Sequence, residues 1–180
     1  MTDLAMVSAL VGSLYVLTHA PLLASPEAAR EGLRHFPRHR WLGRLLTLAA
    51  VAWTAWLVWR AALGFAEPYK APLVVVGAPL TYYLTVTFVD ELLAPRALGV
   101  LLLLAAEPIL AARWDEHPLR LLIAVLAYVW VLAGMVLVVS PYWFRRATER
   151  LLATRGRTRA VGALGVGFGV LLLAVAWLAL

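Results

Sequence analysis

The sequence predicts an all-α integral membrane protein with about six transmembrane helices, and three observations support this fold class. First, 63% of the 180 residues are hydrophobic and 14% are charged, whereas soluble domains are about half apolar and a quarter charged. Second, the apolar residues form six runs near the roughly 20 residues that a helix needs to cross a bilayer. Third, no run shows the period of two that a membrane barrel strand requires, and helices are the other way to satisfy the backbone in lipid.

The six runs cover about residues 4–24, 41–65, 72–89, 97–112, 119–139 and 160–180. The first run follows an acidic start at Asp3 and is expected to be retained, because a signal peptide begins with basic residues. Pro79 interrupts the third run and Pro108 the fourth, so these two form either full spans or a tilted, re-entrant pair. The loops are too short for a separate soluble domain, and residues 1–180 are predicted to form a single transmembrane domain.

The positions of the arginines predict the orientation of the helices. Two loops carry most of the basic charge, the first with Arg30, Arg34, Arg38, Arg40 and Arg44, and the second with Arg145, Arg146, Arg150, Arg155, Arg157 and Arg159. The positive-inside rule places both loops in the cytoplasm, which requires an even number of crossings between them. Four runs separate the two loops, so we expect a multi-pass protein of a bacterial inner membrane with both termini on the outer, periplasmic side.

The two arginine-rich loops share further features. Each begins with a Ser-Pro pair, Ser25-Pro26 or Ser140-Pro141, and each leads into a run that opens with an arginine and a nearby glycine. The short loop at 94–99, between the third and fourth runs, also contains a proline, an arginine and a glycine. This pattern raises the hypothesis that the six helices form three hairpins in one orientation. However, proline, arginine and glycine are common at any helix end. Apolar residues three or four apart predict an amphipathic interfacial helix at 142–158, with a weaker counterpart at 27–40.

A further pattern occupies the last third of the chain. It consists of Ala133-Gly134, Ser140-Pro141, Trp143, Arg145, Arg159 with Gly162, and a glycine-rich final helix. Through these residues, positions from about 130 to 180 resemble a small, uncharacterised family of bacterial two-helix membrane proteins. The resemblance covers under a third of the chain, and it implies a bacterial origin and a membrane location without an activity.

Glu107 is the sharpest candidate for an intramembrane site. It precedes Pro108 inside an apolar run, and a carboxyl group in lipid must be either protonated or paired. Arg60, near the outer end of the second run, is the expected partner. Two other interpretations stay open: Glu107 binds a proton or cation for transport, or it reaches the interface at the end of a short helix.

His19 is the second intramembrane candidate. It shares one helical face with Ser8, Gly12 and Tyr15, and the small residues of this face predict contact with another helix. His19 either forms a hydrogen bond there or ligates a haem or pigment; no other cofactor is predicted. No metal site is predicted, because the acidic stretches at 90–91 and 115–117 are interpreted as solvated loops.

Small and basic residues predict contacts with other helices and with lipid. The candidates for helix packing are Gly165, Gly169, Ala163 and Gly167 in the last run, and Gly77, Thr81 and Thr85 in the third. The candidates for contact with anionic lipid head groups are Arg34, Arg38, Arg145, Arg146 and Arg150. Short loops between apolar runs offer no element that reads a nucleic acid groove, so the lipid bilayer is the expected partner of this charge.

These observations favour three classes of function. A non-enzymatic accessory or structural subunit of a larger membrane complex, bound to other subunits or self-associated, fits the small size and the few polar residues within the runs. A small transporter or channel would use Glu107, Arg60 and the broken third and fourth runs. A haem- or pigment-binding subunit would use His19. The sequence contains no catalytic triad motif, phosphate loop or nucleotide fingerprint, so no enzymatic activity is predicted.

Overall fold

The computed structural model describes residues 3–89, 92–111 and 120–178, and every regular element in this part of the chain is helical. The first elements are α1 (Asp3–Ala24), α2 (Pro26–His35), the 3-10 turn η1 (Phe36–Arg38) and α3 (Arg40–Arg60). They are followed by η2 (Gly64–Tyr69), α4 (Lys70–Pro72), the π-helical turn η3 (Leu73–Gly77) and α5 (Ala78–Phe88). The last elements are α6 (Leu93–Ala111), α7 (Arg120–Val139), α8 (Tyr142–Leu151) and α9 (Arg155–Leu178).

Six helical segments in the described residues are long and apolar enough to cross a membrane. They are α1, α3, the continuous segment Gly64–Phe88, α6, Leu121–Val139 of α7, and α9. Each corresponds to one of the six apolar runs, which confirms the helical fold class. The third and fourth spans have 25 and 19 residues, so both have the length of a full crossing.

Pro79 changes the hydrogen bonding of the third span without ending it. Pro79 cannot donate a hydrogen bond to the carbonyl of residue 75, and the chain widens into the π-helical turn η3 immediately before α5. A turn of this kind absorbs the misfit that a proline creates. In the fourth span, α6 continues through Pro108 to Ala111. The interruptions seen in the sequence are therefore local irregularities of continuous helical segments.

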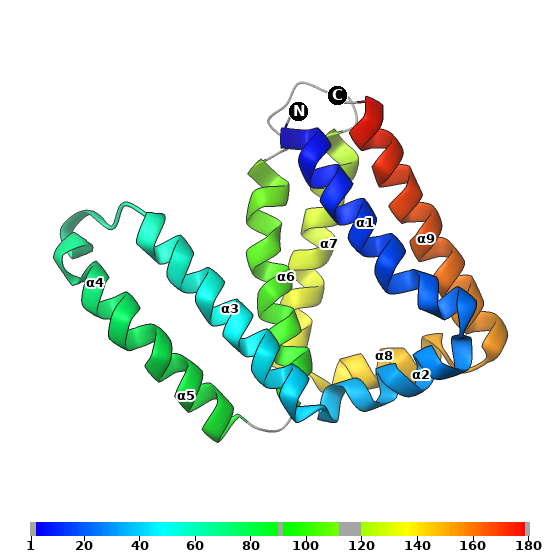
Figure 1. The fold of residues 1–180 in the computed structure, drawn as a ribbon, viewed down its shortest axis with the longest axis horizontal. Coiled ribbons are helices and arrows are strands. Elements are labelled where there is room, and N and C mark those ends of the chain that lie inside the picture. The colour runs from blue at the N-terminus through cyan, green and yellow to red at the C-terminus, as the bar shows by residue number, and fades with distance from the viewer. Residues whose placement is uncertain (1–2, 90–91, 112–119, 179–180) are drawn as a thin grey trace.

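The spans pack both with sequence neighbours and with distant spans (Figure 1). Helix α1 packs along α9, α6 packs along α7, and α3 packs against both α5 and α6. The three-hairpin hypothesis would instead pair α1 with α3 and α7 with α9, and the structure does not support it. Helices α2 and α8 lie between the members of these expected pairs and hold them apart.

A cluster of buried apolar residues lies where four spans converge, near the end of the molecule that carries the chain termini (Figure 1). Its members are Leu4, Ala5, Val11, Ile109, Ile123, Leu126, Ala127, Trp130 and Leu172. The span Gly64–Phe88, by contrast, buries none of its residues. The fold therefore consists of a packed four-helix part, α1, α6, α7 and α9, and a hairpin of α3 and α5 that extends away from it.

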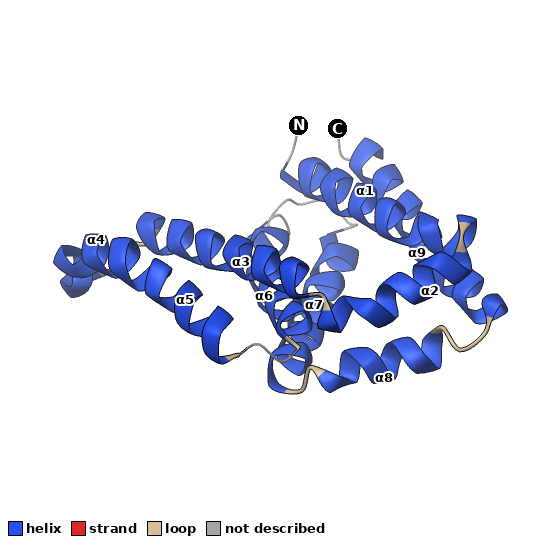
Figure 2. Ribbon diagram, turned by 60° about the horizontal axis from the view of Figure 1, so that its bottom comes forward, coloured by secondary structure: helices blue, strands red, loops and turns tan. Residues whose placement is uncertain are grey.

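Helices α2 and α8 cross the opposite end of the molecule as an antiparallel pair (Figures 1 and 2). Arg30 donates a hydrogen bond of 2.8 Å to the carbonyl of Ala153, and the rings of Phe36 and Phe144 lie 5.0 Å apart. We call α2, η1 and α8 the platform. Both arginine-rich joints thus lie on one side of the molecule, as an even number of crossings between them requires.

The second platform helix is shorter than the sequence predicts. Helix α8 ends at Leu151, whereas the predicted amphipathic helix continues to residue 158. Thr154 starts α9 instead, because its side-chain oxygen accepts a hydrogen bond of 3.2 Å from the backbone nitrogen of Arg157. Arg155, Arg157 and Arg159 therefore belong to the first turns of the last span.

Candidate functional site

Glycine brings two pairs of helices into close contact. A Cβ atom added at Gly12 of α1 would lie 2.8 Å from the carbonyl oxygen of Gly169 in α9, and one added at Gly169 would lie equally close to that of Gly12. Gly99 of α6 and Gly134 of α7 face each other in the same way. A Cβ atom added at Gly99 would lie 2.8 Å from the carbonyl oxygen of Gly134, and one added at Gly134 would lie 2.7 Å from the carbonyl oxygen of Gly99. Because the nearest atoms are backbone oxygens, a side chain at any of these positions would push the helices apart.

His19 packs at the contact between α1 and α9. A Cβ atom at Gly165 would overlap the His19 imidazole, so the ring fills the space left by the missing side chain. The Nδ1 atom of His19 lies 2.9 Å from the carbonyl oxygen of Tyr15. The Tyr15 ring stacks on the imidazole, with the two ring centroids 5.3 Å apart. Trp130 of α7 donates a hydrogen bond of 3.1 Å to the Tyr15 hydroxyl. These contacts give His19 a packing role where α1, α7 and α9 meet.

His19 also borders an apolar cavity of about 670 Å³, which lies mainly between α7 and α9. The described residues contain no group of three or more histidine, aspartate or glutamate side chains able to hold a metal ion. The acidic stretches at 90–91 and 115–117 lie outside the described residues. Ligation of a haem or pigment by His19 stays a prediction.

The structure does not bring Glu107 and Arg60 together. Helices α3 and α6 pack at their first turns, where Gly43 meets Leu93 and Ala94, and they diverge toward Arg60 and Glu107 (Figure 1). The guanidinium of Arg60 lies 4.8 Å from the ring centroid of Trp56, and Glu107 is exposed on α6. The described residues therefore include no ion pair between Arg60 and Glu107, because the extended hairpin carries Arg60 away from α6.

The other predicted packing residues lie in different settings. Gly165 and Gly169 lie in the α1–α9 contact described above. Ala163 and Gly167 are exposed on α9, and a Cβ atom at Gly167 would meet no described atom within 4 Å. Gly77 has equally open surroundings. These three positions therefore make no close helix contact within the described chain.

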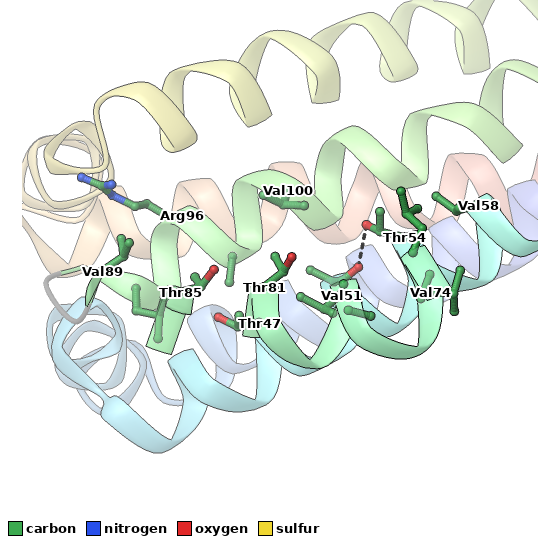
Figure 3. A pocket seen from close by; sticks show the side chains of 17 residues that line it. Thr47, Val51, Thr54, Val58, Val74, Thr81, Thr85, Val89, Arg96 and Val100 are labelled. Carbon is green, nitrogen blue, oxygen red and sulfur yellow. Dashed lines mark hydrogen bonds between the residues drawn. The ribbon is translucent and has the colours of Figure 1, made fainter. Parts of the chain in front are cut away.

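Thr81 and Thr85 line an apolar groove of about 480 Å³ between α3, the segment 73–89 and α6 (Figure 3). Thr47 and Thr54 lie on the α3 wall, and their hydroxyls donate to the carbonyls of Gly43 and Ala50 at 2.8 and 2.9 Å. Since these hydroxyls are satisfied within their own helix, they offer no free donor to the groove. Alanine and valine side chains form most of the remaining surface.

Arg96 lies at the end of this groove that is nearer the platform (Figure 3). Its Nε atom is buried and has no hydrogen-bond partner among the described residues. Arg96 was not among the sequence candidates, although an arginine in the first turn of an otherwise apolar run is a recognisable signal of a cation at the membrane interface.

A second cavity, of about 1050 Å³, lies between the platform and the start of α6. Among the predicted head-group contacts, Arg34, Arg38 and Arg145 line it. Arg146 instead lies over the Trp143 ring at 5.4 Å, and Arg150 lies outside the cavity lining. All five arginines are exposed, so the platform presents a basic surface.

Comparisons of this chain with protein-family models, with curated proteins and with solved structures find no match. The resemblance of residues 130–180 to a family of bacterial two-helix membrane proteins therefore stays a prediction.

Proposed function

We propose that this protein is a non-enzymatic structural subunit of a complex in a bacterial inner membrane, with six crossings and the platform on the cytoplasmic side. The observation that carries the proposal is the extended hairpin, whose span Gly64–Phe88 buries no residue within the chain. Helices in lipid associate through close packing rather than through a general hydrophobic force. A span that packs so little on its own chain is well suited to pack on another membrane protein.

The outer face of the segment formed by η3 and α5 is the proposed contact surface, with Val76 in η3 and Leu80 and Tyr83 in α5. Val76, Leu80 and Tyr83 lie three or four residues apart, so they form one stripe along the helix. All three are exposed, and none lines the groove on the other side of α5. The platform would hold this surface at a defined depth, because arginines near an anionic membrane surface contribute about 1 kcal/mol each.

The transporter alternative has less support. It requires a polar path through the membrane, and its two central residues, Glu107 and Arg60, lie on diverging helices. The groove beside the broken third span is mainly apolar, and the hydroxyls of Thr47 and Thr54 are bonded within α3. A structural role fits this distribution of polar groups better.

Cross-linking in native membranes tests the proposal. The sequence contains no cysteine, so single cysteines at Val76 and Tyr83, which are 62% and 63% exposed, can carry a photoactivatable cross-linker. Matched controls are cysteines at Leu17 of α1 and Leu164 of α9, which are 72% and 75% exposed. We expect Val76 in η3 and Tyr83 in α5 to yield one common adduct and both controls to yield none.

The mass of the adduct identifies the partner. An adduct with twice the 19.7 kDa mass of the chain indicates self-association, and any other single mass indicates a different subunit. The proposal fails if neither Val76 nor Tyr83 forms an adduct, or if the controls yield the same adducts as these two positions.

A further inference from the structure

The apolar groove and the second cavity, which we call the basic cavity, share one wall residue. Leu93, in the first turn of α6, lines both of them. On one side of Leu93 the walls are mainly alanine and valine, and on the other side the lining includes four arginines and two histidines. A ligand that occupies both parts must be amphipathic.

The length of the groove suits one acyl chain. Along α3 it extends from Thr47 to Val58, which is about 16 Å at 1.5 Å per helical residue. The hydrocarbon core of a bilayer is roughly 30 Å thick, so the groove spans about the depth of one leaflet. Because Thr47 and Thr54 keep their hydroxyls bonded within α3, an alkyl chain would leave neither of them without a partner.

The cavity carries an excess of positive charge. The charged side chains that line it are Arg34, Arg38, Arg40 and Arg145 against Glu31 and Glu149. Glu31 already pairs with His35 at 2.7 Å, and Glu149 with Arg145 at 3.5 Å. Arg34 and Arg38 form no ion pair with any described residue. Arg34 and Arg38 are thus uncompensated among the described residues, which favours an anionic occupant.

Arg96 adds a further cation where the groove ends. Its side chain is partly buried, and the unpartnered Nε atom makes an anion nearby favourable, since a buried charge is costly unless it is paired. A guanidinium also matches the geometry of phosphate oxygens, to which it donates two parallel hydrogen bonds.

We propose that this site binds one anionic phospholipid from the leaflet that surrounds the platform. One acyl chain lies in the groove, and Arg34, Arg38 and Arg96 hold the phosphate of the head group. A soluble anion would occupy the cavity and leave the groove empty, whereas a zwitterionic lipid would leave the excess charge of the cavity unbalanced. The bound lipid would also fill the space between α3, α5 and α6, and so brace the extended hairpin.

Native mass spectrometry of the full chain in detergent, with added phosphatidylglycerol or phosphatidylethanolamine, tests the head-group part. We expect one phosphatidylglycerol per chain, bound more tightly than phosphatidylethanolamine. Replacing Arg34, Arg38 and Arg96 with glutamine should weaken phosphatidylglycerol binding by about a hundredfold, given three cations near the head group. The control replaces Arg157 and Arg159 with glutamine; both are exposed at the start of α9 and lie outside the cavity, so this variant should bind phosphatidylglycerol as the wild type does.

A second pair of variants tests the acyl-chain part. Thr81→Phe places a ring in the groove, whereas Leu80→Phe places the same ring on the neighbouring, outward face of α5. We expect Thr81→Phe to lose phosphatidylglycerol and Leu80→Phe to retain it, with both variants folded by thermal unfolding in detergent. Thr81→Leu is measured in parallel, so that a smaller substitution remains if the phenylalanine prevents folding.

Three results would overturn the proposal. The first is equal binding of the two lipids by the wild type. The second is retention of phosphatidylglycerol by either groove-filling variant at position 81 or by the triple arginine variant. The third is that inorganic phosphate raises the unfolding temperature of the wild type and of Thr81→Phe as much as the lipid does, which would make the cavity a site for soluble anions.

Discussion

Single glycine residues determine which helices pair in this protein. Gly12 and Gly169 meet backbone to backbone between α1 and α9, and Gly99 and Gly134 do the same between α6 and α7. In lipid the free energy of helix association comes largely from such close packing. Loss of the close approach at one residue therefore weakens a whole helix pair.

Gly165→Ala should destabilise the protein by about 1–3 kcal/mol, the usual cost of overpacking a filled contact. The added methyl group would overlap the imidazole of His19, which must move and lose its stacking on Tyr15. The measurement is thermal unfolding in detergent. The matched control is Gly167→Ala, two residues along the same helix, where the methyl group meets no described atom within 4 Å.

The control should be neutral or stabilising by up to about 1 kcal/mol, because alanine favours a helix more than glycine does. Removing the imidazole with His19→Ala should rescue part of the loss in the Gly165→Ala background. Equal effects at positions 165 and 167, or no rescue, would contradict the packing role assigned to His19.

At the scale of elements, the platform joins two parts of the molecule that the spans leave separate. Helix α2 runs from the end of α1 to the start of α3, and α8 runs back from α7 to α9 (Figure 1). Arg155 and Glu27 form an ion pair, with 3.7 Å between Nη1 and Oε1, and this pair links the start of α9 to α2. This ion pair is exposed, so it contributes little stability by itself. The apolar side of each platform helix favours a position at a membrane surface more strongly than this ion pair does.

Helix α8 should lie in the head-group region with its apolar face toward the lipid. Spin labels at Trp143, Ala147 and Leu151, which are exposed and four residues apart, should be more accessible to oxygen than a label at Glu149, since Glu149 lies on a different face of the helix. Changing Arg145, Arg146 and Arg150 to glutamate should reduce this difference in vesicles that contain phosphatidylglycerol, because each arginine near the surface contributes about 1 kcal/mol. A uniform, fully aqueous profile in the unmodified protein would contradict the interfacial position.

At the scale of the whole molecule, the fold is an open frame rather than a closed bundle. The four spans α1, α6, α7 and α9 converge near the chain termini, and the platform spreads them apart at the other end (Figure 1). The α3–α5 hairpin joins this frame mainly through the contact of α3 with α6. Its position depends on few contacts within the chain, so lipid and partner contacts are expected to define it.

The topology predicts the accessibility of single cysteines in intact cells. Cysteines at Arg34 and Ala153, which are exposed on the platform side, should react only after the inner membrane is permeabilised. A cysteine at Phe65, which is 97% exposed at the other end of α3, should react with an impermeant reagent from outside. Reaction of positions 34 and 153 from opposite faces would contradict the fold, and an inverted pattern for all three would contradict the orientation alone.

Much of the candidate site could not be read from the sequence, for reasons that particular residues illustrate. Gly165 and Gly169 were recognisable because small residues four apart have a local spacing. Ala163 and Gly167 have the same spacing but are exposed, since spacing does not say which face of a helix meets a neighbour. Arg60 and Glu107 lie at similar depths in the predicted topology, yet depth alone does not determine lateral distance. Arg96 gained its importance only from the groove and cavity that distant helices form around it.

The sequence by itself determined the helical class, the six apolar segments and the placement of both arginine-rich joints on one side. These properties depend on the solvation of local segments, and the composition of each segment specifies its solvation. Only the tertiary structure decided that α1 pairs with α9, that the hairpin extends from the frame, and that an apolar groove ends at a basic cavity. In lipid all apolar helix surfaces are solvated almost equally well, so steric fit between distant residues, rather than hydrophobicity, selects the pairs.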